Sequence, residues 1–184
     1  MIENIITGGN EEEVWQKIST QLNSQTDLVE FTAIIKQNNY HIVLDIDIDL
    51  GGGFESGYET TTFSALLHSL LPFKFGIHPK HLTDEIGKFF GMQDAVVGFA
   101  DFDDKMIVKT NDVDKVRNLL SDPAVRKTLL TLGDFSFEIN SSHTNSKDEK
   151  VSTLQLQIES GITDPVALQP IYHAFYSVLS AVDV

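Results

Sequence analysis

An alternation of side-chain character over residues 40–50 most limits what this chain can fold into. Every second position there is apolar, namely Tyr40, Ile42, Leu44, Ile46, Ile48 and Leu50. The positions between them are mostly polar or acidic (His41, Asp45, Asp47 and Asp49), with Val43 as the exception. Because successive side chains of a strand point to opposite faces, this pattern predicts a strand with one buried face and one face bearing carboxylates.

The same period of two recurs more briefly in four later segments, at Phe73/Phe75/Ile77, Met106/Val108, Phe135/Phe137/Ile139 and Leu154/Leu156/Ile158. A strand over about residues 29–36 is joined to the long strand by Gln37-Asn38-Asn39, since Asn tolerates the positive φ of a tight turn. Residues 59–63 are also rich in β-prone side chains. Strands buried on one side only are typical of antiparallel sheets, so we predict a mostly antiparallel sheet of about 6–7 strands.

Helices are predicted between these strands from their start signals. Asn10 with Glu13 forms a capping-box pattern, and Asn111 is predicted to cap another helix that carries an apolar stripe. Asp-Pro pairs at 122–123 and 164–165 mark two more starts, because Pro is tolerated at the first helical position. A short helix is predicted over about residues 82–90. The last helix is the longest and buries Ile171, Phe175, Val178, Leu179 and Val182, although Pro170 leaves open a later start.

Together these elements predict an α+β fold in which helices pack on one face of the sheet and a long helix ends the chain. No Pro- or Ser-rich linker divides residues 1–184, so we predict a single domain. Strands and helices recur in both halves of the chain, which leaves open a diverged internal duplication.

The charge of the chain is distributed unevenly. The net charge is −14, of which residues 1–104 carry −12, residues 105–127 carry +3 and residues 128–184 carry −5. A negative field of this size repels nucleic acid and anionic membranes, whose binding depends on contacts with phosphate. We therefore expect a protein partner, with no nucleic acid and no membrane among the partners.

Composition also bears on the cellular compartment. The chain has no cysteine, which suits a reducing environment and excludes thiolate chemistry. Its first residues lack the basic-then-apolar layout of a signal peptide, and no apolar run approaches the roughly 20 residues that span a bilayer. The expected localisation is cytoplasmic.

Candidate metal ligands in the sequence lack a closed ligand set. The three aspartates of the 40–50 strand lie about 6.5–7 Å apart, too far to chelate one ion without further ligands. Asp101–Asp104 lacks the Gly and terminal Glu of an EF-hand, while His78 and His81 have no third ligand at a diagnostic spacing. The glycines at 51–53 match no phosphate-binding fingerprint. We expect no metal, no cofactor and no recognisable catalytic residue.

Six cations gather in residues 105–127, which we call the basic island: Lys105, Lys109, Lys115, Arg117, Arg126 and Lys127. Arginine grips carboxylate or phosphate through two bonds, so we predict anion or partner binding by Lys109, Arg117 and Arg126. In a binding site the two arginines should approach each other and stay partly exposed. On a solvated surface they should point apart or pair with acids of the chain itself.

Residues 102–109, which read Phe-Asp-Asp-Lys-Met-Ile-Val-Lys, and the Leu119-Leu120 pair resemble a pattern in uncharacterised bacterial proteins. In those proteins a Phe-Asp pair precedes a strand that ends near a basic residue, and a short helix with a Leu-Leu end follows. The resemblance covers about residues 101–132. It implies a bacterial origin and a recurring module, with no activity or catalytic residue to carry over. Many of those proteins look membrane-anchored, whereas this sequence contains no spanning segment.

These observations favour a non-enzymatic binding or regulatory module of a bacterial cytoplasm, acting through the polar sheet face or the basic island. Two alternatives stay open at this point. One is an acidic inhibitor or immunity-type protein that masks a cationic partner, and the other is an enzyme without a recognisable motif.

Removal of divalent ions tests the expectation that no metal is structural. Because the carboxylate groups lack a closed ligand set, the melting temperature measured by circular dichroism should be the same with and without EDTA. A melting temperature several degrees lower in EDTA would show that a bound cation stabilises the fold.

Overall fold

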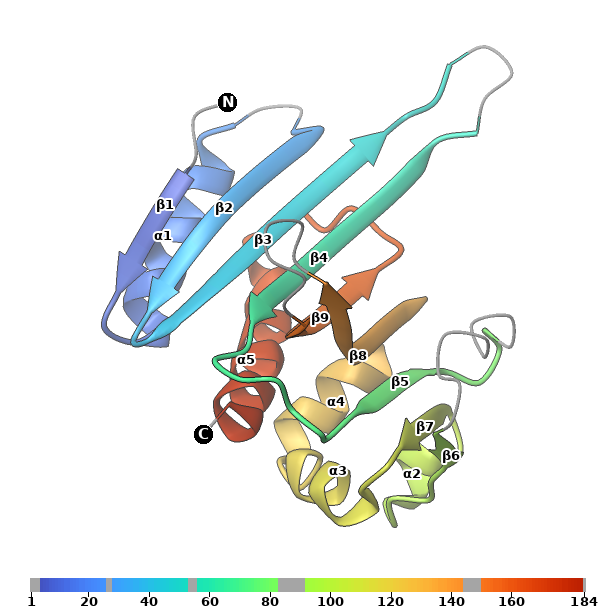
Figure 1. Ribbon diagram of the computed structural model, residues 1–184. Coiled ribbons are helices and arrows are strands. Elements are labelled where there is room, and N and C mark those ends of the chain that lie inside the picture. Colours follow the sequence, from blue (N-terminus) through green and yellow to red (C-terminus); the bar gives the residue numbers. More distant parts are fainter. Residues whose placement is uncertain (1–3, 26–27, 53–55, 83–91, 144–149, 184) are drawn as a thin grey trace.

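The computed structural model describes residues 4–25, 28–52, 56–82, 92–143 and 150–183 (Figure 1). Its elements in chain order are β1 Asn4–Gly8, α1 Glu11–Asn23, β2 Glu30–Gln37, β3 Tyr40–Asp49, β4 Tyr58–Leu66, β5 Phe75–Pro79, β6 Gln93–Asp94, α2 Ala100–Asp103, β7 Met106–Thr110, α3 Val113–Leu119, α4 Pro123–Thr131, β8 Phe135–His143, β9 Lys150–Ile158 and α5 Pro165–Val182. The short helix predicted at 82–90 lies almost entirely outside the described residues.

The described strands form one mixed sheet in the order β1-β2-β3-β4-β9-β8-β5-β7-β6. Among the described strands only β1 and β2 pair in parallel, so the predicted α+β class and the mostly antiparallel sheet are confirmed. The predicted number of 6–7 strands is wrong, because the described residues alone form nine. The two additional strands are the edges of the sheet. β1 carries two adjacent isoleucines that blur its alternation, and the two residues of β6 are extended only through their pairing with β7.

Local sequence signals explain where most helices start. The Asn10 side chain accepts a hydrogen bond from the Glu13 amide and caps α1 as predicted. The predicted cap of α3 is wrong by one residue, because Asp112 caps that helix while Asn111 bonds the backbone of the segment before β5. The possible later start of α5 is also wrong, since this helix begins at Pro165 and continues through Pro170.

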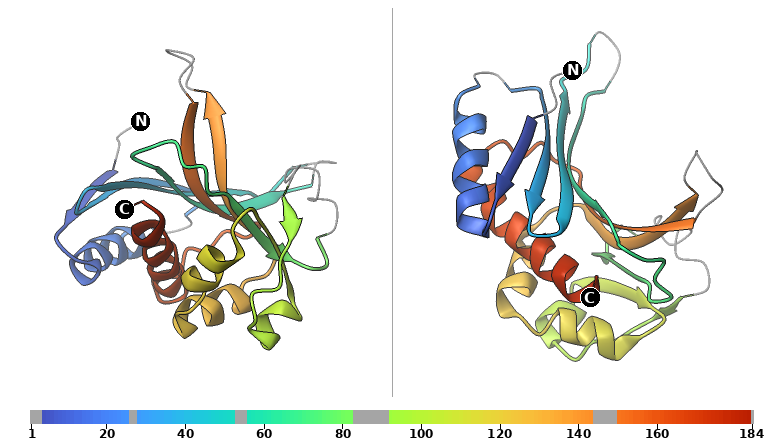
Figure 2. Two further views of the ribbon diagram at one scale, coloured as in Figure 1. Left: turned by 60° about the horizontal axis from the view of Figure 1, so that its bottom comes forward. Right: turned by 60° about the vertical axis from the view of Figure 1, so that its left-hand side comes forward.

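Helices cover one face of the sheet, as Figure 2 shows for α1, α5 and α4. The buried side chains of the strands alternate toward this layer, so that Ile42, Leu44 and Ile46 of β3 are fully buried against it. α5 has 18 residues and runs across the middle of the sheet, which confirms the predicted long C-terminal helix.

Phe175 of α5 lies at the centre of the core. Its ring centroid is 5.7 Å from that of Phe63 on β4 and 6.1 Å from that of Phe137 on β8. Those two strands flank β9, where Leu156 stands between the two phenylalanines in the strand register. One aromatic side chain of the helix therefore bridges three neighbouring strands.

Tyr172, one turn earlier on α5, links the helix to the other half of the sheet. Its ring stacks on Trp15 of α1 at 5.9 Å, and its hydroxyl donates a hydrogen bond of 2.5 Å to Gln37 Oε1 of β2. Burial raises the pKa of Tyr172 far above its usual value. The buried hydroxyl stays a neutral donor, which satisfies the buried amide of Gln37.

Truncation of the central phenylalanine should be severely destabilising. Phe175→Ala leaves a cavity between the helix and three strands, so the free energy of unfolding should fall by about 3–5 kcal/mol in urea denaturation. Val166→Ala is the matched control, because Val166 lies on the same helix with 79% of its surface exposed, and it should change stability by less than about 0.5 kcal/mol. A loss below about 1 kcal/mol for Phe175→Ala would contradict this packing.

Candidate interaction surface

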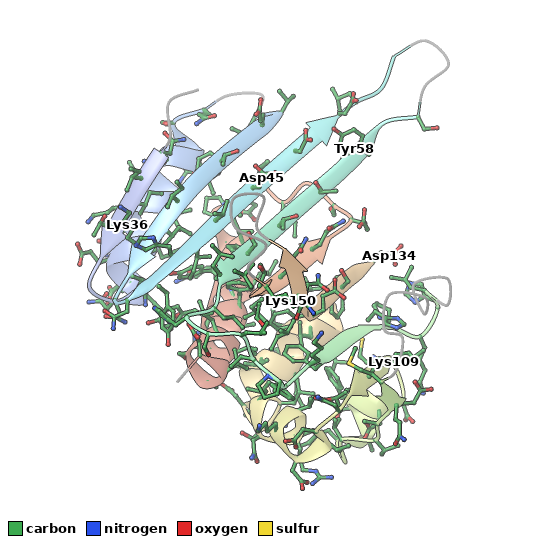
Figure 3. All side chains as sticks on the ribbon, in the orientation of Figure 1. Lys36, Asp45, Tyr58, Lys109, Asp134 and Lys150 are labelled. Atoms are coloured by element: carbon green, nitrogen blue, oxygen red, sulfur yellow. The ribbon has the colours of Figure 1, made fainter. Side chains whose placement is uncertain are left out.

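The face of β1–β4 that points away from the helices is called the open face here. The antiparallel register of β2, β3 and β4 aligns its side chains in cross-strand rows. These rows, in order along the strands, are Glu30–Asp47–Thr60, Thr32–Asp45–Thr62, Ile34–Val43–Ser64 and Lys36–His41. Figure 3 places Asp45 between Lys36 and Tyr58 along the strands. The open face thus changes from acidic at one end to apolar in the middle and basic at the other.

The apolar row extends onto the edge strand. Ile5 of β1 pairs with Ile34 of β2, and Ile34 pairs with Val43 of β3. Ile5 is 52% exposed, and the other two are partly exposed. Three β-branched side chains on neighbouring strands therefore face solvent as one strip. Val43, the exception in the sequence alternation, was the available signal for this strip, and sequence reasoning did not use it.

A hollow of about 580 Å³ lies beside the apolar row. Its lining comes from β2, the β2–β3 turn, β3, β4, the segment that follows β4, and β9, and it includes Ile34, Val43, Leu66, His41 and His68. Leu66 is a large apolar side chain with 65% of its surface exposed. Apolar side chains rimmed by polar ones around a depression are typical of binding surfaces.

The segment that borders this hollow is held by the end of α5. Asp183 accepts hydrogen bonds from the His68 amide at 2.8 Å and contacts the His68 ring nitrogen Nδ1 at 2.5 Å. The Tyr40 hydroxyl donates to the Asp183 carbonyl at 3.2 Å. The wall of the hollow is therefore fixed to the helical layer.

The carboxylates of β3 are held in place by hydroxyl groups of neighbouring strands. Thr32 Oγ1 donates to Asp45 Oδ1 at 2.6 Å, and the Tyr58 hydroxyl donates to Asp47 Oδ2 at 2.8 Å. The hydrogen bond and the negative charge of Asp47 raise the pKa of Tyr58. Neither aspartate forms an ion pair with a described residue.

Lys109 of the basic island lies on β7, the strand next to the edge strand β6, whereas the open face is at the β1 end of the sheet. The Lys109 side chain is mostly buried, and its Nζ donates to Asp94 of β6 at 2.6 Å. Lys109 and Glu138 of β8 flank Gly76 in the register of the sheet. Glu138 is buried, and its Oε2 accepts no hydrogen bond from any described residue.

Arg117 and Arg126 both hold the segment that joins β6 to α2. Arg117 Nε donates to the Val97 carbonyl at 3.0 Å, and its Nη1 donates to Asp114 at 2.5 Å. The guanidinium of Arg126 lies 3.9 Å from the centroid of the Phe99 ring.

Arg126 also supplies hydrogen bonds to the backbone carbonyls at the end of α3, because its Nη1 donates to the carbonyl oxygens of Leu120 and Ser121. Free carbonyls at a helix end favour a nearby cation. The structure therefore brings the two arginines to one segment, separates Lys109 from them onto β7, and gives each of the three cations a partner within the chain.

The described residues contain no cluster of three or more His, Asp or Glu side chains arranged to hold a metal ion. No helix among them combines the length and the apolar character needed to cross a lipid bilayer.

Comparison with protein-family models, with curated proteins and with solved structures found no match to this chain.

Neutralising Arg126 should show how much it contributes to stability. Arg126→Gln removes the contact with the Phe99 ring and the charged hydrogen bonds at the end of α3, so unfolding should cost about 1–2 kcal/mol less in urea denaturation. Lys127→Gln is the control, since this exposed neighbour loses the same charge and should change stability by less than about 0.5 kcal/mol. Equal effects of the two substitutions would show that the Arg126 guanidinium adds no stability and is available to an external anion.

Proposed function

We propose that this chain is a binding module that receives a protein partner on its open face. The observation that carries the proposal is the apolar row of Ile5, Ile34 and Val43 beside the 580 Å³ hollow. Exposed apolar rows of this kind cost solvation free energy in an isolated protein, and covering them with a partner recovers it.

The surroundings of the row support this role. Thr32 and Asp45 lie on one side of it, while Lys36 and His41 lie on the other. A polar rim around an apolar centre is the usual composition of a protein interface, in which the rim excludes water from the centre. The antiparallel strands below provide a rigid base for such a surface.

Site-specific photo-crosslinking tests the proposal. A benzophenone amino acid at Leu66, on the open face, should give a discrete crosslinked species in lysate of the source cells. The same probe at Glu12, an exposed position of α1 in the helical layer, should not. The partner of the Leu66 species is then identified by mass spectrometry.

Val43→Lys in the Leu66 probe protein serves as the decisive variant. A charge in the centre of the apolar row should reduce the crosslinked fraction by about fivefold or more, since central interface residues typically contribute over about 1 kcal/mol. Circular dichroism should be unchanged, because the side chain of Val43 lies on the solvent side of β3. Crosslinking that is equal from Leu66 and Glu12, or unaffected by Val43→Lys, would contradict the proposal.

A further inference from the structure

We infer that the partner of the open face is a cationic protein segment with apolar anchor side chains. The anchors cover the row of Ile5, Ile34 and Val43, and lysine or arginine side chains of the segment pair with Asp45 and Asp47. This inference rests on the proposed function and adds the chemistry of the partner.

The β3 carboxylates are held in position but not neutralised. Asp45 and Asp47 each accept a hydrogen bond through one oxygen, from Thr32 and Tyr58 respectively. The second oxygen of each accepts no hydrogen bond from a described residue, and no described cation lies within ion-pair distance of either carboxylate. By contrast, Asp94 and Asp114 pair with Lys109 and Arg117 of the basic island.

Two carboxylates of the open face stand in an unfavourable arrangement. Glu30 of β2 stands directly opposite Asp47 of β3 in the strand register, and both side chains lie on the open face. Like charges in directly opposed positions of an antiparallel pair destabilise it. A cation bound between Glu30 and Asp47 reduces the repulsion between the two carboxylates. Binding of a cationic group is therefore favoured both by its attraction to each carboxylate and by the relief of that repulsion.

The charges of the open face favour a cationic partner over a second copy of the chain. The open face carries four carboxylates on β2 and β3, from Glu30, Asp45, Asp47 and Asp49, against the single lysine Lys36. In a two-fold symmetric dimer Lys36 could pair with one carboxylate of the other copy, which leaves most of them unpaired. Each copy also has a net charge of −14, so self-association through this face is opposed electrostatically.

The spacing of the rows fits a single segment. Same-face residues of a strand lie about 6.5–7 Å apart, so the Asp45 row is that far from the Val43 row. An apolar anchor and a cationic side chain two residues apart in a strand, or three to four apart in a helix, span this distance. One amphipathic segment can therefore occupy both rows at once.

Three fluorescein-labelled synthetic peptides of equal length provide the probes: one of Leu and Lys, one of Leu and Glu, and one of Ser and Lys. Binding is measured by fluorescence anisotropy at physiological ionic strength, where long-range attraction is screened over about 8 Å. The Leu/Lys peptide should bind the wild-type protein at least about tenfold more tightly than either of the other two.

The carboxylates are tested with two double variants of equal net charge. Asp45→Asn with Asp47→Asn should weaken binding of the Leu/Lys peptide on the order of tenfold, while its unfolding midpoint should equal or exceed that of the wild type. Glu12→Gln with Asp101→Asn removes two exposed carboxylates elsewhere and should change affinity less than about twofold. An equal loss in both variants would mean that only the net charge attracts the peptide, and would overturn the inference.

The apolar row is tested separately with Ile34→Thr and Val43→Thr, which keep β-branched side chains in both strands. The double variant that combines these two substitutions should also weaken binding of the Leu/Lys peptide several-fold. If it does so while the aspartate variant binds normally, the open face is a docking surface but the partner is not cationic. Failure of the Leu/Lys peptide to bind the wild type overturns the inference, and so does self-association of the free protein in sedimentation velocity. If neither the aspartate nor the apolar-row variant alters binding, the proposed function fails as well.

Discussion

The packing of Phe175 between the rings of Phe63 and Phe137 is the contact on which the rest of the structure depends. It fixes α5 across the centre of the sheet, where the helix also reaches α1 through Tyr172 and Trp15. Because α5 lies in this position, one face of each central strand is buried in the core. The other face of β1–β4 then faces solvent as a consequence of the same packing.

The composition of the open face follows from the strand register. The tight turn between β2 and β3, with Asn38 at a φ of 53°, sets the pairing of Ile34 with Val43 and of Glu30 with Asp47. A slip by one residue would bury the aspartates against the helices and expose the isoleucines of β3. The register that buries the hydrophobic core therefore also aligns the apolar row and places the Glu30 carboxylate opposite that of Asp47.

The two charged regions of the chain differ in how their charges are balanced. In the basic island, Arg117 and Arg126 contact the 97–99 segment, and Lys109 pairs with Asp94. On the open face, Asp45 and Asp47 are oriented by hydroxyl groups that cannot cancel their charge. Hydrogen bonds of this kind hold a carboxylate in position while leaving its electrostatic attraction for a cation intact.

The sequence by itself determined the local elements, because side-chain periodicity and capping residues act over a few neighbouring positions. The long strand over residues 40–50, the cap at Asn10 and the C-terminal helix were predictable for that reason. Only the tertiary structure decided which strands are neighbours, and therefore that Val43 meets Ile34 and Ile5 in an exposed row. The tertiary structure also contains two edge strands, β1 and β6, whose extended form depends on pairing with distant residues. Such pairings join positions far apart in the chain, and no local pattern encodes them.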